Sequence, residues 1–394
     1  MGGTLTPRTS EEVKEAINWA ISAQEPLEIV GNGTKRAIAP PRQTAYTLDV
    51  SGHAGIVAYE PEELVLTLHP GTTMRELAEA MEAKGQMFAF EPPDLSPLLG
   101  VDGGATFGGT FATNFAGPRR LTAGAVRDHM LGVHAVSGRG ETFKAGGRVV
   151  KNVTGYDLAR ALCGSWGTLA VATELTVKVL PRPETEITLL LTGLDPERAV
   201  AAMARAMGSS GDVSGAAHLP ADVAPDGIDG PVTALRLEGF GPSVAARRDH
   251  LSKLLAEHSL SVLEVDASRA LWRAVRDVTP FVGTPHVVWR VSVAPTAGPE
   301  VAAAAPPGSR ILFDWAGGLL WIETPAVGDG GEAAIRATVM ASGGGHATLI
   351  RAPASLRSAV PTFQPTAPAL EALSERMRNA FDPQTILNPG RMAR

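Results

Sequence analysis

Three glycine-rich segments, each next to a strand-like apolar run, constrain this sequence more than any other feature. They are IVGNGTKR at 29–36, DGGATFGGTFATNFAG at 102–117, and a third in which KNVTGYDL (151–158) precedes GSWGTLAVATE (164–174). Glycine adopts backbone conformations that other residues avoid, and it lets a ligand approach the main chain closely. Three separate loops of this kind predict one extended ligand lying between two β-rich subdomains.

The first segment follows a predicted strand and suits a phosphate group. Gly31 and Gly33 would allow consecutive backbone N–H groups to point into one concavity, as in a pyrophosphate-binding nest. A turn that needs positive φ explains the same Gly-Asn-Gly run equally well. Arg36 stands where a Rossmann fingerprint has its third glycine, and no G-x-x-x-x-G-K-[ST] run occurs. Neither Rossmann nor P-loop binding is therefore predicted.

Length and composition narrow the class of protein further. A chain of 394 residues exceeds one ordinary core, so two domains are expected. The net charge of −6 and the lack of a Lys/Arg-rich run argue against nucleic acid as a partner. Cys163 is the only cysteine, which excludes an internal disulfide and a Cys-ligated iron–sulfur cluster within this chain. No long apolar run or signal-like start occurs, so we expect a cytoplasmic protein.

The pattern of apolar residues and turn signals predicts an α+β fold with a boundary at Pro181-Arg182-Pro183. We expect domains at 1–181 and 182–364, and a C-terminal helix and tail at 365–394. In the second domain, strands alternate with helices as in an antiparallel sheet with helices on one face. The expected strands are 186–191, 232–238, 287–293 and 310–324, and the expected helices are 196–207, 243–257, 268–278 and 332–342.

The order of the glycine segments resembles a known family. A nest, then G-G-x-x-A-T-N at 108–114 with Arg127-Asp128 downstream, then T-G-Y-D-L and G-S-x-G-T-L, is similar to the PCMH-type FAD-binding domain of the vanillyl-alcohol-oxidase-type flavoprotein superfamily. KNVTGYDL and the closing FDPxxILNPG are similar to the flavoprotein subunits of bacterial glycolate oxidase. The resemblance covers residues 10–181 and 365–394. It implies a two-subdomain FAD-binding domain, an α+β cap domain, and a C-terminal tail that returns to the FAD domain.

The resemblance also implies which residues hold FAD. Relatives with a covalent flavin often carry a His just after the early glycine loop; residues 31–36 contain none, so we expect noncovalent FAD. The residues expected at the pyrophosphate lie in the runs 31–35 and 108–114, and include Gly31, Asn32, Gly33, Thr34, Lys35, Gly108, Gly109, Ala112, Thr113 and Asn114. Those expected elsewhere along the cofactor are Thr106, Gly155 and the run 164–171, which includes Gly164, Gly167, Thr168 and Val171, with Asn388 near the flavin ring.

Substrate chemistry beside a flavin calls for a proton acceptor and a carboxylate clamp, for which His and Arg are suited. Relatives that oxidise 2-hydroxy acids carry a stretch resembling HGDGNLH, tied to a metal in some members. The nearest counterpart here is SGGGHATLIR at 342–351, with one His and no carboxylate, so we predict no metal site. The candidate catalytic residues are His346, Arg351 and Arg290. A packed or surface role is the alternative reading of His346.

Three functional hypotheses fit these observations. The resemblance implies an FAD subunit of a multisubunit glycolate oxidase acting on glycolate or D-lactate, beside a larger FAD subunit and an iron–sulfur subunit, with at most peripheral attachment to the inner face of the cell membrane. The missing His-rich stretch would then put primary oxidation on the partner, leaving this FAD to relay electrons or to stabilise the fold. The second hypothesis is a self-contained 2-hydroxy acid dehydrogenase, and the third a noncatalytic flavin-binding scaffold. The glycine loops fit all three.

Overall fold

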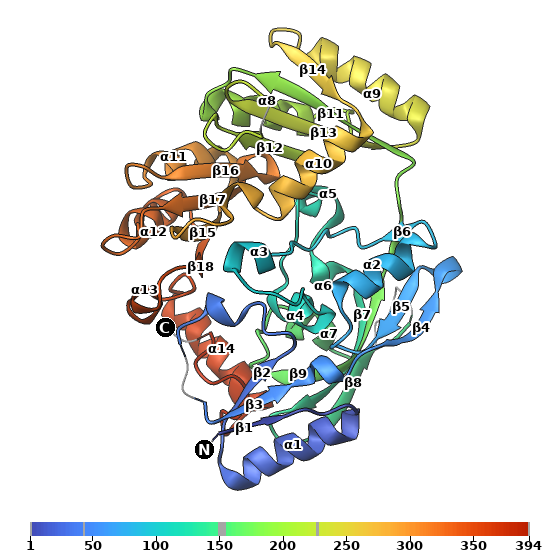
Figure 1. Ribbon diagram of the computed structural model, residues 1–394, viewed down its shortest axis with the longest axis vertical. Helices are drawn as coiled ribbons and strands as arrows, with labels where there is room; N and C mark the ends of the chain where they lie inside the picture. Colours follow the sequence, from blue (N-terminus) through green and yellow to red (C-terminus); the bar gives the residue numbers. More distant parts are fainter. Residues whose placement is uncertain (1, 42–43, 149–154, 226–227, 393–394) are drawn as a thin grey trace.

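A computed structural model describes residues 2–41, 44–148, 155–225 and 228–392, so residues 151–154 of the KNVTGYDL run lie outside the described part of the chain. The molecule consists of two bodies stacked along its long axis (Figure 1). The lower body contains the chain up to residue 181, and the upper body is built on the large sheet that starts with β11 (Thr185–Thr192). Both bodies combine helices with sheets, which confirms the predicted α+β fold.

The lower body begins with a small parallel sheet in the order β1-β3-β2. Thr9 caps the N-terminus of helix α1, because its side chain accepts a hydrogen bond from the backbone N–H of Glu12. The helix buries Val13 and Ile17 against Leu27 and Leu48 of the sheet. The bounds are β1 (Gly3–Leu5), α1 (Ser10–Ala23), β2 (Leu27–Val30) and β3 (Tyr46–Asp49).

A second, antiparallel sheet in the order β4-β5-β9-β7-β8 completes the lower body. Its core is formed by strand residues such as Leu66 and Leu175 packed on Phe107 and Phe111 of the glycine-rich helix α4. The strands are β4 (Ile56–Glu60), β5 (Val65–Leu68), β7 (Met130–Ser137), β8 (Thr142–Gly146) and β9 (Ala170–Lys178). The helices are α2 (Met74–Glu82), α3 (Ser96–Leu99), α4 (Phe107–Thr113), α5 (Arg120–Ala123), α6 (Val126–His129) and α7 (Leu158–Leu162), and β6 (Gln86–Met87) pairs with β10 (Leu180–Pro181).

The upper body is an eight-stranded antiparallel sheet in the order β14-β11-β13-β12-β16-β17-β15-β18. Successive side chains of a strand point to opposite faces. Accordingly, Leu189 and Leu191 pack on α8 and α9, whereas Leu190 faces α10 and the lower body. The elements are α8 (Pro196–Met207), β12 (Gly215–Leu219), β13 (Val232–Gly239), α9 (Gly241–Leu254), β14 (Leu260–Leu263), α10 (Val265–Arg276), β15 (Val287–Ser292), α11 (Gly298–Ala303), β16 (Arg310–Asp314), β17 (Leu319–Thr324), α12 (Glu332–Ala341), β18 (His346–Arg351) and α13 (Ala354–Ala359).

Two details of this sheet differ from the sequence-based expectation. Helix α10 lies on the opposite face from α8 and α9, because Leu271 and Trp272 join the core between the two bodies. The segment 310–324 is a hairpin of β16 and β17, so the prediction of one strand is wrong. Trp315, Ala316 and Gly317 have φ values of 52°, 56° and 99°, and such left-handed residues end a strand.

The C-terminal segment returns to the lower body. Helix α14 (Pro368–Phe381) leads to a tail in which Leu387 pairs with Leu27 of β2. The Asp382 carboxylate accepts hydrogen bonds from the backbone N–H groups of Ile386 and Leu387, which fixes the turn between helix and tail. The tail therefore lies beside the N-terminal sheet (Figure 1).

A buried network of charges joins the two bodies. Arg236 on β13 donates to both oxygens of Glu91 in the lower body, at 2.9 and 2.8 Å, and Arg119 donates to Glu238 of β13 at 2.9 Å. Burial alone would raise the pKa of the Glu91 carboxyl, but Arg236 and Arg119 hold it below its ordinary value. No helix of the described residues is long and apolar enough to cross a bilayer.

Candidate cofactor crevice and the cationic site beside it

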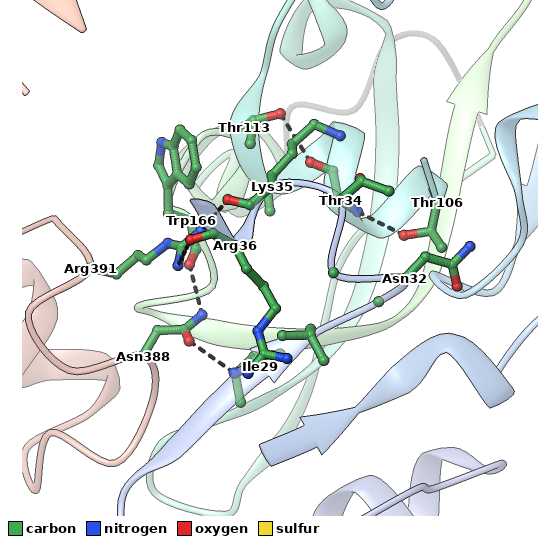
Figure 2. A pocket seen from close by; sticks show the side chains of 15 residues that line it. Ile29, Asn32, Thr34, Lys35, Arg36, Thr106, Thr113, Trp166, Asn388 and Arg391 are labelled. Atoms are coloured by element: carbon green, nitrogen blue, oxygen red, sulfur yellow. Dashed lines mark hydrogen bonds between the residues drawn. The ribbon is translucent and has the colours of Figure 1, made fainter. Parts of the chain in front are cut away.

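Two adjoining cavities form one crevice between β2, helix α4 and the loop before β9 (Figure 2). The glycine-rich segments at 29–36, 102–117 and 164–172 all contribute to its walls. Asn32 donates to the carbonyl oxygens of Gly103 and Gly104 at 2.9 and 3.2 Å, which ties the first segment to the second. The residues that line both cavities are Ile29, Val30, Gly31, Thr106, Gly109, Ala112, Trp166 and Asn388.

Glycines of the crevice serve different purposes. A Cβ on Gly31 would lie 2.5 Å from Thr106 Oγ1, and one on Gly108 would lie 2.8 Å from the Pro70 side chain, so both positions are set by packing. A Cβ on Gly109 would meet nothing closer than 3.5 Å, yet Gly109 lines the crevice. A side chain at this position would therefore occupy ligand space rather than clash with protein.

Lys35 places a positive charge at the same wall. Its Nζ would lie 3.8 Å from a Cβ on Gly109, and it makes no hydrogen bond to any described residue. Burial lowers the pKa of Lys35 to about 8, against a smaller opposing effect of Asp94. A buried ammonium group without an anionic partner is the feature expected where a phosphate group binds.

The C-terminal tail closes the crevice (Figure 2). Asn388 accepts a hydrogen bond from the Ile29 N–H at 2.8 Å and donates to the Trp166 carbonyl at 2.9 Å. Arg391 donates to the Lys35 carbonyl at 2.7 Å, and its guanidinium lies 5.5 Å from the Trp166 ring centroid. Residues from the two ends of the chain thus line one cavity.

A second polar site lies at the junction of the two bodies. Arg290 on β15 is 7 % exposed, and aromatic rings surround its guanidinium: the centroids of Trp315, Phe115 and Trp321 are 4.9, 5.2 and 5.9 Å away. His346 begins the neighbouring strand β18 and lies opposite Ser292, two residues beyond Arg290. Directly opposed residues, and residues two apart, share a sheet face, so Arg290 and His346 point to the same side.

Arg351, by contrast, is fully engaged. Its guanidinium donates to the carbonyl oxygens of His286, Phe281 and Leu98 at 2.9, 2.7 and 3.1 Å, and also to Thr284 and Glu323. The bond to Leu98 crosses between the two bodies. These contacts favour a structural role for Arg351, whereas Arg290 and His346 are brought together.

Comparisons with known proteins support a flavin as the ligand of the crevice. The FAD binding domain family matches residues 2–146. The glycolate oxidase subunit GlcE of Escherichia coli (strain K12) is 34 % identical over 384 residues, which span 97 % of each protein. The chain belongs to the family of the glycolate oxidase subunit GlcE. GlcD of Bacillus subtilis (strain 168) is 33 % identical over 47 % of this chain and 38 % of its own length.

Solved structures show the fold of this GlcE-family chain. A p-cresol methylhydroxylase with substrate bound superposes with a TM-score of 0.75 at 15 % identity, covering 99 % of this chain and 88 % of the other. An alkyldihydroxyacetonephosphate synthase gives a TM-score of 0.72 at 16 % identity, covering 98 % and 75 %. The predicted two-subdomain FAD-binding fold with a cap is confirmed.

FAD is the cofactor of this GlcE-family protein, and the crevice fits it. Bound FAD supplies the redox chemistry, while Lys35 and the backbone of the first glycine loop would neutralise its pyrophosphate. The structure places these predicted residues in the crevice: Gly31, Asn32, Gly33, Thr34, Lys35, Thr106, Gly108, Gly109, Ala112, Thr113, Gly167, Val171 and Asn388.

Other predicted cofactor residues do not line the crevice. Asn114 ends α4 in a left-handed conformation and accepts a hydrogen bond from the Arg127 N–H. Gly164 packs on Asn114, Thr168 donates to the Ser165 carbonyl, and Gly155 is exposed next to the undescribed residues. Trp166, which lies within the predicted run 164–171, lines the crevice, whereas the predictions missed Arg391, although the Arg after NPG was a visible signal. The described residues contain no cluster of three His, Cys, Asp or Glu side chains suited to a metal ion.

Proposed function

We propose that this chain is the FAD subunit of a glycolate-oxidising complex that takes electrons from a small 2-hydroxy acid, glycolate or D-lactate, and passes them to partner subunits. The end-to-end match to GlcE carries the proposal, because it includes the upper body as well as the cofactor crevice. The partial matches to GlcD and to the D-lactate dehydrogenase of Anaerostipes hadrus support the substrate class. Absence of His, Cys and Tyr from the described crevice walls supports noncovalent FAD.

The proposed partners are a larger FAD subunit and an iron–sulfur subunit. The single cysteine supports a cluster on another chain, because Cys163 is buried and donates to the Phe111 carbonyl at 3.3 Å. Burial raises the pKa of its thiol far above the ordinary value, which disfavours the thiolate that a cluster needs. We place the complex in the cytoplasm, with at most peripheral contact with the cell membrane.

A second candidate function is oxidation of the 2-hydroxy acid on this chain itself. The meeting of Arg290 and His346 on one sheet face favours it, since a carboxylate clamp and a neutral imidazole are the groups that such a substrate requires. Partial desolvation, with the charges of Arg290 and Arg120 nearby, lowers the pKa of His346, which favours its neutral imidazole.

Anaerobic flavin absorbance separates the two candidates. The purified chain and the complex co-expressed with its partners are each mixed with glycolate or D-lactate. We expect bleaching of the flavin band in the complex. Bleaching of the isolated chain would establish self-contained oxidation, and a flavin that stays oxidised in a fully assembled complex would contradict the proposed function.

A further inference from the structure

Arg290 is a buried cation without an anionic partner. Its guanidinium makes no hydrogen bond and no ion pair with a described residue, although Arg290 is only 7 % exposed. Other buried arginines of the chain are paired: Arg236 with Glu91, and Arg336 with Glu332. A charge that is largely removed from water is costly unless a group of opposite charge binds it.

A second arginine approaches the same aromatic ring from the lower body. The guanidinium of Arg120 of α5 lies 5.0 Å from the Trp315 ring centroid, against 4.9 Å for Arg290, and likewise makes no hydrogen bond or ion pair with a described residue. Burial, and then the charge of Arg120, lower the pKa of Arg290 to about 10. Contact with an aromatic ring stabilises one cation, but it does not explain why two cations, Arg290 and Arg120, approach the same Trp315 ring.

Asp314 interacts electrostatically with Arg290, but no hydrogen bond or ion pair joins the two side chains. Asp314 precedes Trp315, is buried, and uses its carboxylate to accept the Trp315 N–H at 2.7 Å. Burial raises the pKa of Asp314 to about 7, so much of it is uncharged near neutral pH.

The sheet face around Arg290 is otherwise apolar. Leu319, Trp321 and Ile350 of this face belong to the core between the two bodies. On this sheet face, Arg290 of β15 lies opposite Thr348 of β18, and two residues further along β15 Ser292 lies opposite His346; these two cross-strand pairs are polar. No described residue forms a side-chain hydrogen bond with Ser292 or Thr348, so their hydroxyl groups are available.

The site is open to solvent and close to the flavin crevice. Buried nitrogens that lack both solvent and a partner occur in the described residues at His129, His218, Arg336 and Arg357, and Arg290 is not among them. Phe115 contacts Arg290 on one side and the crevice residue Trp166 on the other, with ring centroids 5.8 Å apart. Phe115 and Trp166 therefore connect the surroundings of Arg290 to the crevice.

We propose that Arg290 and Arg120 bind the carboxylate of a small 2-hydroxy acid at the junction of the two bodies, with Ser292, Thr348 and His346 available to its hydroxyl group. Planar guanidinium groups match a carboxylate in two parallel hydrogen bonds. This inference rests on the proposed function for the identity of the acid, and it adds Arg120 and the site that both bodies complete.

Binding to the FAD-loaded chain tests the inference without turnover. Calorimetric titration with oxalate, which has no C–H bond to oxidise, and with glycolate should give a saturable site. Arg290→Met and Arg120→Met should each weaken binding about 10- to 100-fold, the loss expected for a charge-assisted hydrogen-bonding partner. Arg269→Met, an exposed arginine of α10, is the control and should bind as the wild type does.

The outcomes separate this site from its alternatives. Arg290→Met should melt no lower than the wild type, because an unpaired buried cation has been removed; a lower melting temperature together with no wild-type oxalate binding would show a structural cation and overturn the proposal. Phosphate binding as tight as oxalate would overturn the carboxylate assignment. Oxalate binding that depends on both arginines in a complex that never oxidises glycolate would support the site while rejecting the proposed function. If the complex oxidises glycolate but its Arg290→Met variant binds oxalate as tightly as the wild type, the proposed function would stand and the Arg290 site would be rejected.

Discussion

The affinity of the apoprotein for FAD should fall as the pH rises above about 8, because of Lys35. The pKa of Lys35 is lowered from 10.5 to about 8 by burial, so the ammonium group loses its proton within an accessible range. A bound pyrophosphate stabilises the protonated form, and binding above the pKa must therefore take up a proton. From pH 7 to pH 9 the Kd should rise about tenfold, or about 1.4 kcal/mol, since one pKa unit corresponds to that free energy.

Lys35 makes FAD affinity and apoprotein stability change in opposite directions with pH. Without FAD, the pKa of Lys35 is 10.5 in the unfolded chain and about 8 in the folded chain, so the unfolded chain keeps this proton to a higher pH. Lys35 therefore makes the apoprotein more stable as the pH rises through that window, while FAD binding becomes weaker. A general loss of folding at high pH cannot produce both trends.

Two variants give the controls. Lys35→Arg keeps the charge at every pH, so its Kd for FAD should stay level from pH 7 to pH 9. Lys35→Met should bind more weakly and also without a pH slope. Flavin fluorescence titration of the apoprotein measures all three. Equal slopes in the wild type and Lys35→Arg would refute the assignment of Lys35 to the pyrophosphate.

Three further predictions concern other parts of the molecule. Gly109→Val should fold but purify without flavin, since its side chain fills the crevice, whereas Gly108→Ala should lower the melting temperature through its clash with Pro70; a yellow Gly109→Val protein at full occupancy would contradict this. Arg236→Met should cost about 3–5 kcal/mol in urea unfolding, because it leaves Glu91 without its bidentate partner; a loss below about 1 kcal/mol would show that the network is not needed for stability. His346→Ala should retain flavin in every case and should abolish turnover by the isolated chain if that chain oxidises substrate; unchanged turnover there would remove His346 as its base.

Local features of the sequence were enough to predict much of the cofactor crevice. Gly33 and Gly167 have φ values of 69° and 68°, and such positions can be recognised because few other residues adopt them. The return of the tail was expected from the family resemblance, and the hydrogen bonds of the Asp382 carboxylate to a turn a few residues away are the local contacts that fix it. The C-terminal helix expected within residues 365–394 is α14, at residues 368–381.

Contacts between distant segments could not be predicted in this way. Arg290 and Arg351 were equivalent candidates in the sequence, and only the structure shows that Arg351 is held by Glu323 and several carbonyl groups while Arg290 has no such partners among the described residues. Arg120 was not among the predicted residues, because its contact with Trp315 forms only when the lower body packs against the upper body. The turn of the hairpin at 310–324 spans residues 315–318, so Gly317-Gly318 was the turn signal that the prediction of one strand overlooked, whereas Trp315 and Ala316 rarely mark a turn.

The position of Asn388 and Arg391 has a consequence for biosynthesis. Most of the crevice wall comes from residues 29–36, 106–113 and 165–172, yet the hydrogen bonds to Ile29 and to the Lys35 carbonyl are supplied by residues translated more than two hundred positions later. A nascent chain on the ribosome would fold its N-terminal sheets early but would lack one wall of the cofactor site until residue 391 had emerged. Stable loading of FAD should therefore follow the synthesis of residue 391, and chains that terminate before it should be unable to retain flavin.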